Sequence, residues 1–308
     1  MTKYLPEGYL LGTIENKLYQ KSISALEESY RQGRILESIA IVCDSNHNLW
    51  VDLNGIRGKI LREEGAVGIE DGSTRDIALI SRVNKPVCFV ITGFETDETG
   101  KSVAVLSRRA VQQQCMENHI ATLKPGDIIP ARVTHLESFG CFVDIGCGIS
   151  SLLPIDAISV SRISHPKERF KNGQDLRVVV KSIDEYGRIC LTHKELLGTW
   201  EENAALFMPG ETVAGIIRSV ESYGVFVELS PNLAGLAEAR DDVYPGQHAS
   251  VYIKSLIPEK MKVKLIIVDA FDSEIQYKQP QYFYKSNHIS VFTYSPPCSE
   301  KLIETVFE

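Results

Sequence analysis

The sequence has 308 residues, in which 33 lysines and arginines stand against 40 aspartates and glutamates, giving a net charge of −7. Hydrophobic residues make up 44% and charged residues 24%, proportions that are typical of globular chains and exclude disordered and collagen-like classes. The length predicts two or three domains. The negative total argues against a nucleic-acid partner, because phosphate binding usually leaves a basic footprint, but it describes the whole chain and not one face.

Seven cysteines occur without a C-x-x-C pair, and several lie in apolar runs such as Val87-Cys88-Phe89. Cysteines of this kind are usually small buried hydrophobes in a reduced protein, so we expect a cytoplasmic protein with no bound metal. The first residues lack a continuous apolar stretch, and no run approaches the roughly 20 apolar residues that span a bilayer. We therefore expect no membrane partner and no cofactor.

The first third of the chain predicts a helical segment, 1–33, followed by a diverged barrel, 34–108. Residues 13–32 have the helical spacing of apolar residues. Five short β-rich runs follow, at 34–43, 49–53, 59–61, 87–93 and 102–106. A linker helix is predicted over 109–124. Trp50 could stack on a ligand but is expected to pack, and we assign this barrel a protein-contact role.

Residues 125–194 predict a second barrel. Its β-rich runs lie at 128–136, 140–145, 176–183 and 189–192, between turns rich in Gly and Asp. About 70 residues with five such strands are typical of a small closed or partly open barrel.

An internal repeat predicts a third barrel over 209–268, after a linker helix over 195–208. Residues 125–126 recur at 209–210 and residues 137–144 recur at 221–228, both at an offset of 84. Residues 173–174 recur at 246–247, at an offset of 73, so the second copy has a shorter connection. The extension 269–308 matches no copy. We therefore predict a mainly β chain of three tandem five-stranded barrels, the first of them diverged, joined by short helices.

Two aromatic residues frame the sharpest motif of the second barrel, Phe139-Gly140-Cys141-Phe142. Residues three apart point to opposite faces of a regular strand, but a glycine often marks a bulge that changes the register. A bulge at Gly140 would place both rings on one outer surface, where stacking contributes about 1–3 kcal/mol per base. The alternative is that one or both rings fill the barrel core.

Residues 125–196 resemble the RNA-binding domain of the small-subunit ribosomal protein one (S-one) family. The resemblance rests on the Pro-Gly opening, the motif around Phe139, His165-Pro166, residues 170–173 and residues 181–184. It implies a five-stranded OB barrel whose outer face binds single-stranded RNA. It also implies that Phe139 and Phe142 stack on bases, with Asp184 and Arg188 as the polar pair beside them.

Two positions qualify this resemblance in the second barrel. Pro154 stands where the family often has a histidine, so it cannot supply that contact. His165 belongs to the His-Pro segment typical of ribosomal members, and such a residue is more often part of a loop than a ligand.

The third barrel keeps only part of the family pattern. Tyr223 and Phe226 match the aromatic pair, but Glu238 stands at the histidine position, where it would repel phosphate. Lys262 matches Arg188, while residues 258–259 replace the turn that carries Asp184. We therefore expect weaker RNA contact here than in the second barrel, with a structural or partner-binding role as the alternative.

Basic residues gather within the second barrel, although residues 125–196 hold as many acidic as basic side chains. The stretch 157–181 carries six of them: Arg162, Lys167, Arg169, Lys171, Arg177 and Lys181. A second group lies on the closing strands of the third barrel: Lys254, Lys260, Lys262 and Lys264. Such groups can follow a phosphate backbone with salt-dependent affinity, although charge runs are usually solvated faces.

Signatures of catalysis are missing from the sequence, which has no G-x-x-x-x-G-K-[ST], H-E-x-x-H or G-x-S-x-G. Asp269, Asp272 and Glu274 carry oxygen ligands suited to Mg²⁺, but aspartates after a strand are much more often a turn. We therefore interpret the chain as a non-enzymatic protein that binds single-stranded RNA in translation or mRNA handling. The small ribosomal subunit is a further candidate partner, and the sequence sets no oligomeric state. The alternatives are a protein-interaction scaffold with decayed RNA binding and the accessory half of an RNA-processing enzyme.

Overall fold

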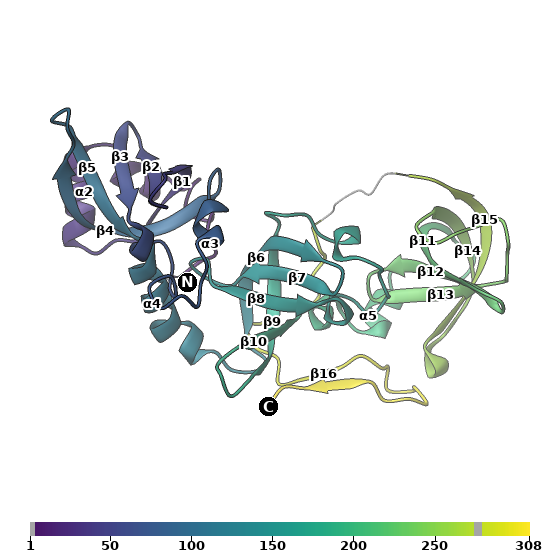
Figure 1. Cartoon of the computed structure of the whole chain (residues 1–308). Coiled ribbons are helices and arrows are strands. Elements are labelled where there is room, and N and C mark those ends of the chain that lie inside the picture. The colour runs from purple at the N-terminus through teal and green to yellow at the C-terminus, as the bar shows by residue number, and fades with distance from the viewer. Residues whose placement is uncertain (1–3, 274–278) are drawn as a thin grey trace. The chain divides into compact units, whose positions relative to one another are not determined.

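The computed structural model describes residues 4–273 and 279–308 (Figure 1). Three closed five-stranded barrels account for most of it, which confirms the predicted mainly β fold class of tandem OB-type barrels. The chain divides into two compact units. One contains the residues up to Leu123 together with Pro130–Arg132 and Asp144–Ser150, and the other contains the remainder. None of the helices in the described ranges is long and apolar enough to cross a membrane.

The first barrel has the strand order β1-β2-β3-β5-β4. Its strands are β1 (Leu36–Cys43), β2 (Leu49–Leu53), β3 (Ile56–Ile60), β4 (Pro86–Thr96) and β5 (Ser102–Ser107). Its helices are α1 (Ile14–Tyr19), α2 (Ile23–Arg31), α3 (Ile77–Ile80) and α4 (Arg108–Asn118). The single helix predicted over 13–32 is two helices, because Ser22 accepts a hydrogen bond from the N–H of Ala25 and caps a new start.

The middle barrel has the order β10-β8-β7-β6-β9 and the third barrel the order β11-β12-β13-β15-β14. The middle strands are β6 (Ile128–Glu137), β7 (Gly140–Asp144), β8 (Ser150–Pro154), β9 (Asp175–Ile183) and β10 (Ile189–Thr192). The third-barrel strands are β11 (Thr212–Glu221), β12 (Gly224–Ser230), β13 (Leu233–Ala237), β14 (His248–Ile257) and β15 (Lys262–Phe271). Buried and more exposed residues alternate along β13 and most of β15, as expected for strands with one face in a barrel core.

The sequence repeat is also a repeat of hydrogen bonds. The N–H of Gly173 donates to the carbonyl of Val133 at 2.7 Å, and the N–H of Gly246 donates to the carbonyl of Ile217 at 2.8 Å. These two acceptors are 84 residues apart, the offset at which the first halves of the barrels align. The middle and third barrels are therefore two copies of one unit in geometry as well as in sequence.

The predicted linker helix over 195–208 is interrupted. Gly198 has φ of 88°, a conformation that a helix cannot contain, so a 3-10 turn over Lys194–Leu197 is followed by a short helix, α5 (Trp200–Ala204). A Cβ at Gly198 would also lie 2.8 Å from the ring of Phe283. Leu196 and Trp200 are both buried, so this connection is part of the core of the second unit.

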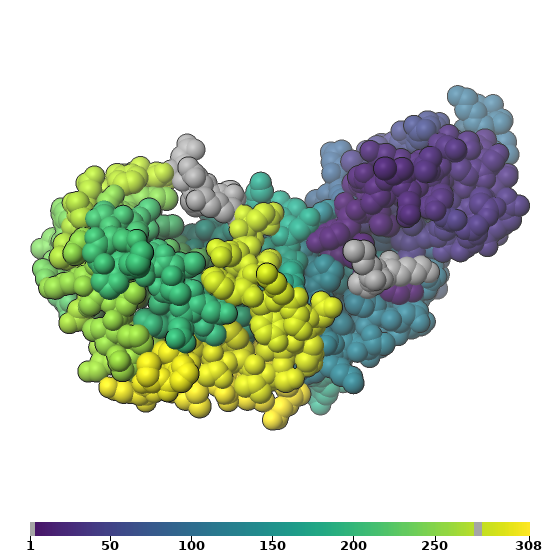
Figure 2. All heavy atoms as spheres, turned by 180° about the vertical axis from the view of Figure 1, so that it is seen from behind, coloured from purple at the N-terminus to yellow at the C-terminus, as the bar shows by residue number. Residues whose placement is uncertain are grey.

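The C-terminal extension packs against the same unit and ends in a small sheet of β16 (Val291–Thr293) and β17 (Glu304–Val306). Arg177 donates to the carbonyls of Tyr284 and Ser286, both at 2.8 Å. The hydroxyl of Tyr294 donates to the carbonyl of Asn232 at 2.6 Å. The yellow segment of Figure 2 lies along this surface. Arg177 is one of the six basic residues of the stretch 157–181, and its guanidinium binds the C-terminal extension.

Candidate nucleic-acid interface

Phe139 and Phe142 lie together on the outside of the middle barrel. Their ring centroids are 6.1 Å apart in an edge-to-face arrangement, and Phe139 is 54% exposed while Phe142 is half-buried. Cys141 and Val143, between and beyond them, are buried in the barrel. The pair is therefore a surface feature, and the alternative that one or both rings fill the barrel core is wrong.

The rings meet for a different reason than the expected bulge at Gly140. β6 ends at Glu137 and β7 begins at Gly140, so Phe139 is a turn residue and need not follow the strand alternation. The glycine is required by packing, because a Cβ there would lie 2.5 Å from the carbonyl oxygen of Leu153.

Asp184 and Arg188 lie in the turn between β9 and β10 and pair with each other. The Nε of Arg188 donates to the Asp184 carboxylate at 2.7 Å, and the guanidinium lies 5.2 Å from the centre of the Tyr186 ring. The backbone N–H of Arg188, followed by the guanidinium and the N–H of Tyr186, lowers the pKa of Asp184. Arg188 remains an exposed cation, and Asp184 fixes where it points.

Four lysines and His165 are also among the predicted RNA contacts. Four lysines are exposed: Lys167 and Lys171 in the β8–β9 connection, Lys181 on β9 and Lys254 on β14. His165 caps a 3-10 turn over Pro166–Glu168, where its Nδ1 accepts a hydrogen bond from the N–H of Lys167 at 3.1 Å. The predicted loop role of His165 is thus structural, and it orients the residues beside it.

Arg169 was predicted to contact RNA, and the structure contradicts this prediction. Its side chain is only 11% exposed and forms an ion pair with Glu228 of the third barrel. Arg218 donates to Glu228 from Nε at 2.7 Å and also pairs with Glu168, and the hydroxyl of Ser161 donates to Glu228 at 2.6 Å. We call these five residues the Glu228 network. Arg169 serves the packing of the second unit, because an arginine in this position is not free for phosphate.

The Glu228 network keeps its carboxylate ionised inside the protein. Burial raises the pKa of Glu228, but the guanidiniums of Arg169 and Arg218 outweigh that effect and the net pKa is lowered. A buried ion pair of this kind is stable only while all of its partners are present.

The third barrel carries the second aromatic pair. The rings of Tyr223 and Phe226 are 6.2 Å apart and edge-to-face, with Tyr223 66% exposed in the β11–β12 turn and Phe226 half-buried on β12. In register, Phe226 lies beside Leu236 of β13, which lies beside Lys264 of β15. Register partners point to the same face of a sheet, so Lys264 shares the face of the aromatic pair. Lys262 is exposed two residues earlier on the same face of β15, and Glu238 is exposed just after β13.

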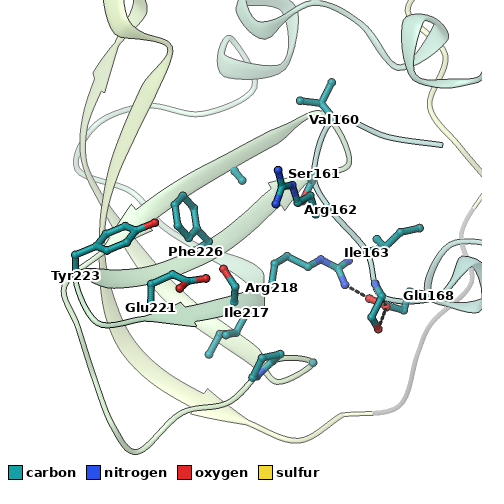
Figure 3. A pocket seen from close by; sticks show the side chains of 15 residues that line it. Val160, Ser161, Arg162, Ile163, Glu168, Ile217, Arg218, Glu221, Tyr223 and Phe226 are labelled. Atoms are coloured by element: carbon teal, nitrogen blue, oxygen red, sulfur yellow. Dashed lines mark hydrogen bonds and ion pairs between the residues drawn. The ribbon is translucent and has the colours of Figure 1, made fainter. Parts of the chain in front are cut away.

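A pocket of about 690 Å³ opens beside this second pair (Figure 3). Its lining comes from the loop that follows β8, from β11, β12 and β13, and from the loop before β14. The loop is held over the third barrel because the N–H of Ser161 donates to the carbonyl of Pro231 at 3.0 Å and the N–H of Val160 to the side chain of Asn232 at 3.1 Å.

The first barrel holds an aromatic at the equivalent position. Val42, Trp50 and Lys59 are neighbours across β1, β2 and β3, as Ser219, Phe226 and Leu236 are across β11, β12 and β13. The pairing of β1 with β2 shifts register between Ala40 and Val42. The pairing of β11 with β12 shifts at the equivalent place, between Ile217 and Ser219.

Trp50 lies under cations. Arg57 is 4.3 Å and Lys59 5.6 Å from the indole centre, and the indole N–H donates to Asp44 at 3.0 Å. This cluster is hard to predict from sequence, because the barrel lacks the aromatic-Gly-x-Phe motif and only strand register shows the equivalence.

Glu274, one of the three acidic residues named at the end of β15, lies outside the described residues. Asp272 accepts a hydrogen bond from the hydroxyl of Tyr244, and the Asp269 carboxylate accepts the N–H of Ala270. In the part of the chain that the structure covers, no three His, Cys, Asp or Glu side chains are grouped to hold a metal ion.

Residues 122–194 match the family model of the S1 RNA binding domain. The predicted resemblance of the middle barrel to the RNA-binding domain of the S-one family is therefore confirmed.

Over a longer stretch the chain is similar to bacterial ribosomal proteins. It is 32% identical over 189 residues to the small ribosomal subunit protein bS1 of Staphylococcus aureus, covering 55% of this chain and 48% of the relative. It is 28% identical over 279 residues to a bS1 homolog of Bacillus cereus, covering 87% of this chain and 68% of the relative. The chain thus spans about half the length of the Staphylococcus aureus relative.

Among solved structures, a multidomain protein with nucleic acid binding domains from Streptococcus pneumoniae matches at 16% identity. The match covers 77% of this chain and 74% of that chain, with a TM-score of 0.25.

Proposed function

We propose that this protein binds single-stranded RNA, mainly on the outer face of the middle barrel, and that it handles mRNA in translation in the cytoplasm without catalysing a reaction. The observation that carries the proposal is the exposed aromatic pair of Phe139 and Phe142 on a barrel that matches the S1 RNA binding domain. Every base has a flat π-face, so such a pair stacks on bases with little regard to sequence.

Charged residues around the middle barrel support the proposal. Lys167, Lys171 and Lys181 are exposed, and Arg188 is 76% exposed at its side chain. We assign these cations to the phosphate backbone and assign Asp184 to the positioning of Arg188. In the third barrel, Tyr223 and Phe226 form the second stacking pair, with Lys254 and Lys262 as its phosphate contacts. The small ribosomal subunit is the partner that the bS1 relatives suggest.

The test is fluorescence anisotropy with a labelled oligo-U in the full chain. Replacing Phe139 and Phe142 together with Ala should weaken binding at least ~10-fold, because stacking contributes about 1–3 kcal/mol per base. Tyr30→Ala is the matched control, since Tyr30 is 45% exposed and makes the same edge-to-face contact with Phe94, at 6.2 Å, on the first barrel.

Unchanged affinity in a folded double variant would contradict the assignment of the platform. If the wild-type chain shows no salt-dependent binding at all, the protein is a scaffold and RNA binding is lost. Co-sedimentation with small ribosomal subunits, with and without the double substitution, tests the partner separately.

A further inference from the structure

The pocket of the third barrel combines a stacking surface with two charged groups that have no partner among the described residues. Its volume of about 690 Å³ lies within the usual range for small-ligand sites. Tyr223 and Phe226 form its aromatic side, which is the stacking pair of the proposed function. The inference below rests on that function and adds a base preference to it.

Four charged side chains line the pocket in the described part of the chain. Arg218 and Glu168 are paired with each other inside the Glu228 network. The side chains of the other two, Arg162 and Glu221, are exposed and make no hydrogen bond or ion pair to any described residue. Figure 3 shows Arg162 on the loop and Glu221 on the strand that leads to Tyr223.

Glu221 is on the same face as the rings. Ser219 is the register partner of Phe226, and Glu221 follows Ser219 by two residues on β11. Side chains two apart on a strand point to the same face, so the carboxylate projects beside the stacking surface. A base stacked on Phe226 would therefore present its edge to a group that only accepts hydrogen bonds.

The four bases differ in what they can give to a carboxylate. Guanine has an N1–H next to an amino group, and the two donors match the two carboxylate oxygens. Adenine and cytosine offer one amino group each, and uracil offers one N–H flanked by two carbonyl oxygens that a carboxylate repels. We propose that this pocket is a guanine-selective nucleotide site, in which Glu221 reads the base edge and Arg162 holds a phosphate.

The middle barrel shows why the preference belongs to the third barrel. Glu137 is the counterpart of Glu221, but Nε2 of His135 lies 2.7 Å from its carboxylate. The counterpart of His135 is Ser219, which makes no such contact. The carboxylate of the middle barrel is therefore already engaged, and its platform remains tolerant of base identity.

The experiment measures the full chain against three labelled heptamers of U with guanine, inosine or uracil at the central position. Inosine keeps N1–H but lacks the amino group, so it removes one of the two hydrogen bonds. The wild-type protein should bind the guanine heptamer at least about 5-fold more tightly than the uracil one, with inosine between them. The preference should persist when Phe139 and Phe142 are both replaced by Ala.

Glu221→Gln should abolish the preference for guanine, since an amide has one acceptor and one donor group. Glu137→Gln is the matched control and should leave the preference intact. Arg162→Ala should weaken all three heptamers equally and reduce the salt dependence. Thermal unfolding of each variant establishes that it is folded.

Three results would overturn the proposal. If all three heptamers bind within twofold of one another with normal salt dependence, the RNA-binding function stands and the guanine site does not exist. If Glu221→Gln keeps the wild-type preference, another group reads the base. Failure of every heptamer to bind overturns this inference together with the proposed function.

Discussion

Asp144 of the middle barrel and Glu228 of the third barrel occupy the same place in the repeat, 84 residues apart, yet their surroundings are opposite. Both are buried at the far end of the strand that carries the aromatic motif. Asp144 accepts the N–H groups of Glu7 at 2.7 Å and of Gly146 at 2.8 Å. Glu228 accepts from the guanidiniums of Arg169 and Arg218.

The two acids therefore have opposite pKa directions. Burial, with the nearby Glu7 carboxylate, raises the pKa of Asp144 to about 7. Burial also raises the pKa of Glu228, but two guanidiniums reverse the balance and lower it. Equivalent positions of the repeat thus each hold a segment that precedes their own barrel, Asp144 through the backbone N–H of Glu7 and Glu228 through the guanidinium of Arg169.

The largest expected effect comes from removing the Glu228 anchor. Glu228→Ala leaves the largely buried guanidinium of Arg169 without its ion-pair partner and leaves Arg218 with Glu168 alone, and it should destabilise the second unit by about 3–5 kcal/mol. Urea unfolding should be followed by the fluorescence of Trp200, which is buried in that unit, in a Trp50→Phe background. Glu259→Ala, at an exposed position, should change stability by less than about 0.5 kcal/mol. A loss under ~1 kcal/mol for Glu228→Ala would mean that the network adds nothing to packing.

Titration separates the two acids by sign. Because the folded pKa of Asp144 is raised, the folded state binds the proton more tightly than the unfolded state, and this contribution is lost as pH rises toward and through about 7. Each pH unit in that window changes the free energy of unfolding by up to about 1.4 kcal/mol. The stability of wild type relative to Asp144→Asn should therefore fall between about pH 4 and pH 7.

Glu228→Gln supplies the opposite case. The folded pKa of Glu228 is lowered, so its contribution is present above its ordinary value and is lost as pH falls. The stability difference between wild type and Glu228→Gln should shrink below pH 4.5. The same sign of pH dependence in both variants would refute the contrast.

The aromatic pairs should differ less than the anchors. Replacing Tyr223 and Phe226 with Ala should weaken oligo-U binding about 3-fold, against at least ~10-fold for the middle pair, since each stacked base contributes about 1–3 kcal/mol. The third pair should contribute less on uracil because Glu221 disfavours that base. Anisotropy of both double variants on one oligo-U decides the order, and a larger loss in the third barrel would reverse the roles of the two barrels.

The sequence predicted the barrels well. The strand pattern within each barrel is visible over a few neighbouring residues, and the 84-residue repeat shows that the pattern occurs twice. The sequence also placed the exposed pairs of both barrels, although the reason at Phe139 is a turn and not a bulge. The prediction of one continuous linker helix was wrong at Gly198. This residue has a positive φ, and it lies against Phe283 of the C-terminal extension.

Contacts between residues far apart in the sequence could not be predicted from it. Arg169 lies among lysines in the sequence and looks like one more phosphate contact, yet its partner Glu228 is 59 residues away. Trp50 is seen to occupy the position equivalent to Phe226 only when β1, β2 and β3 are compared in register with β11, β12 and β13. Charge and aromatic content identify candidates, but the partner of each candidate depends on how distant segments pack.

The smallest expected effect concerns the lysines beside the two platforms. For single strands, each phosphate contact contributes about 0.7 to the slope of log affinity against log salt, so Lys262→Ala with Lys264→Ala should lower the slope by up to about 1.4. Lys167→Ala with Lys171→Ala tests the middle barrel in the same way, and Lys17→Ala with Lys21→Ala, on exposed positions at the first barrel, is the control. Because Lys264 shares the face of Phe226 in register, its slope should fall even on short oligonucleotides that occupy one platform. If short strands lose salt dependence only with the middle-barrel lysines, RNA does not reach the third barrel until the strand is long enough to engage both.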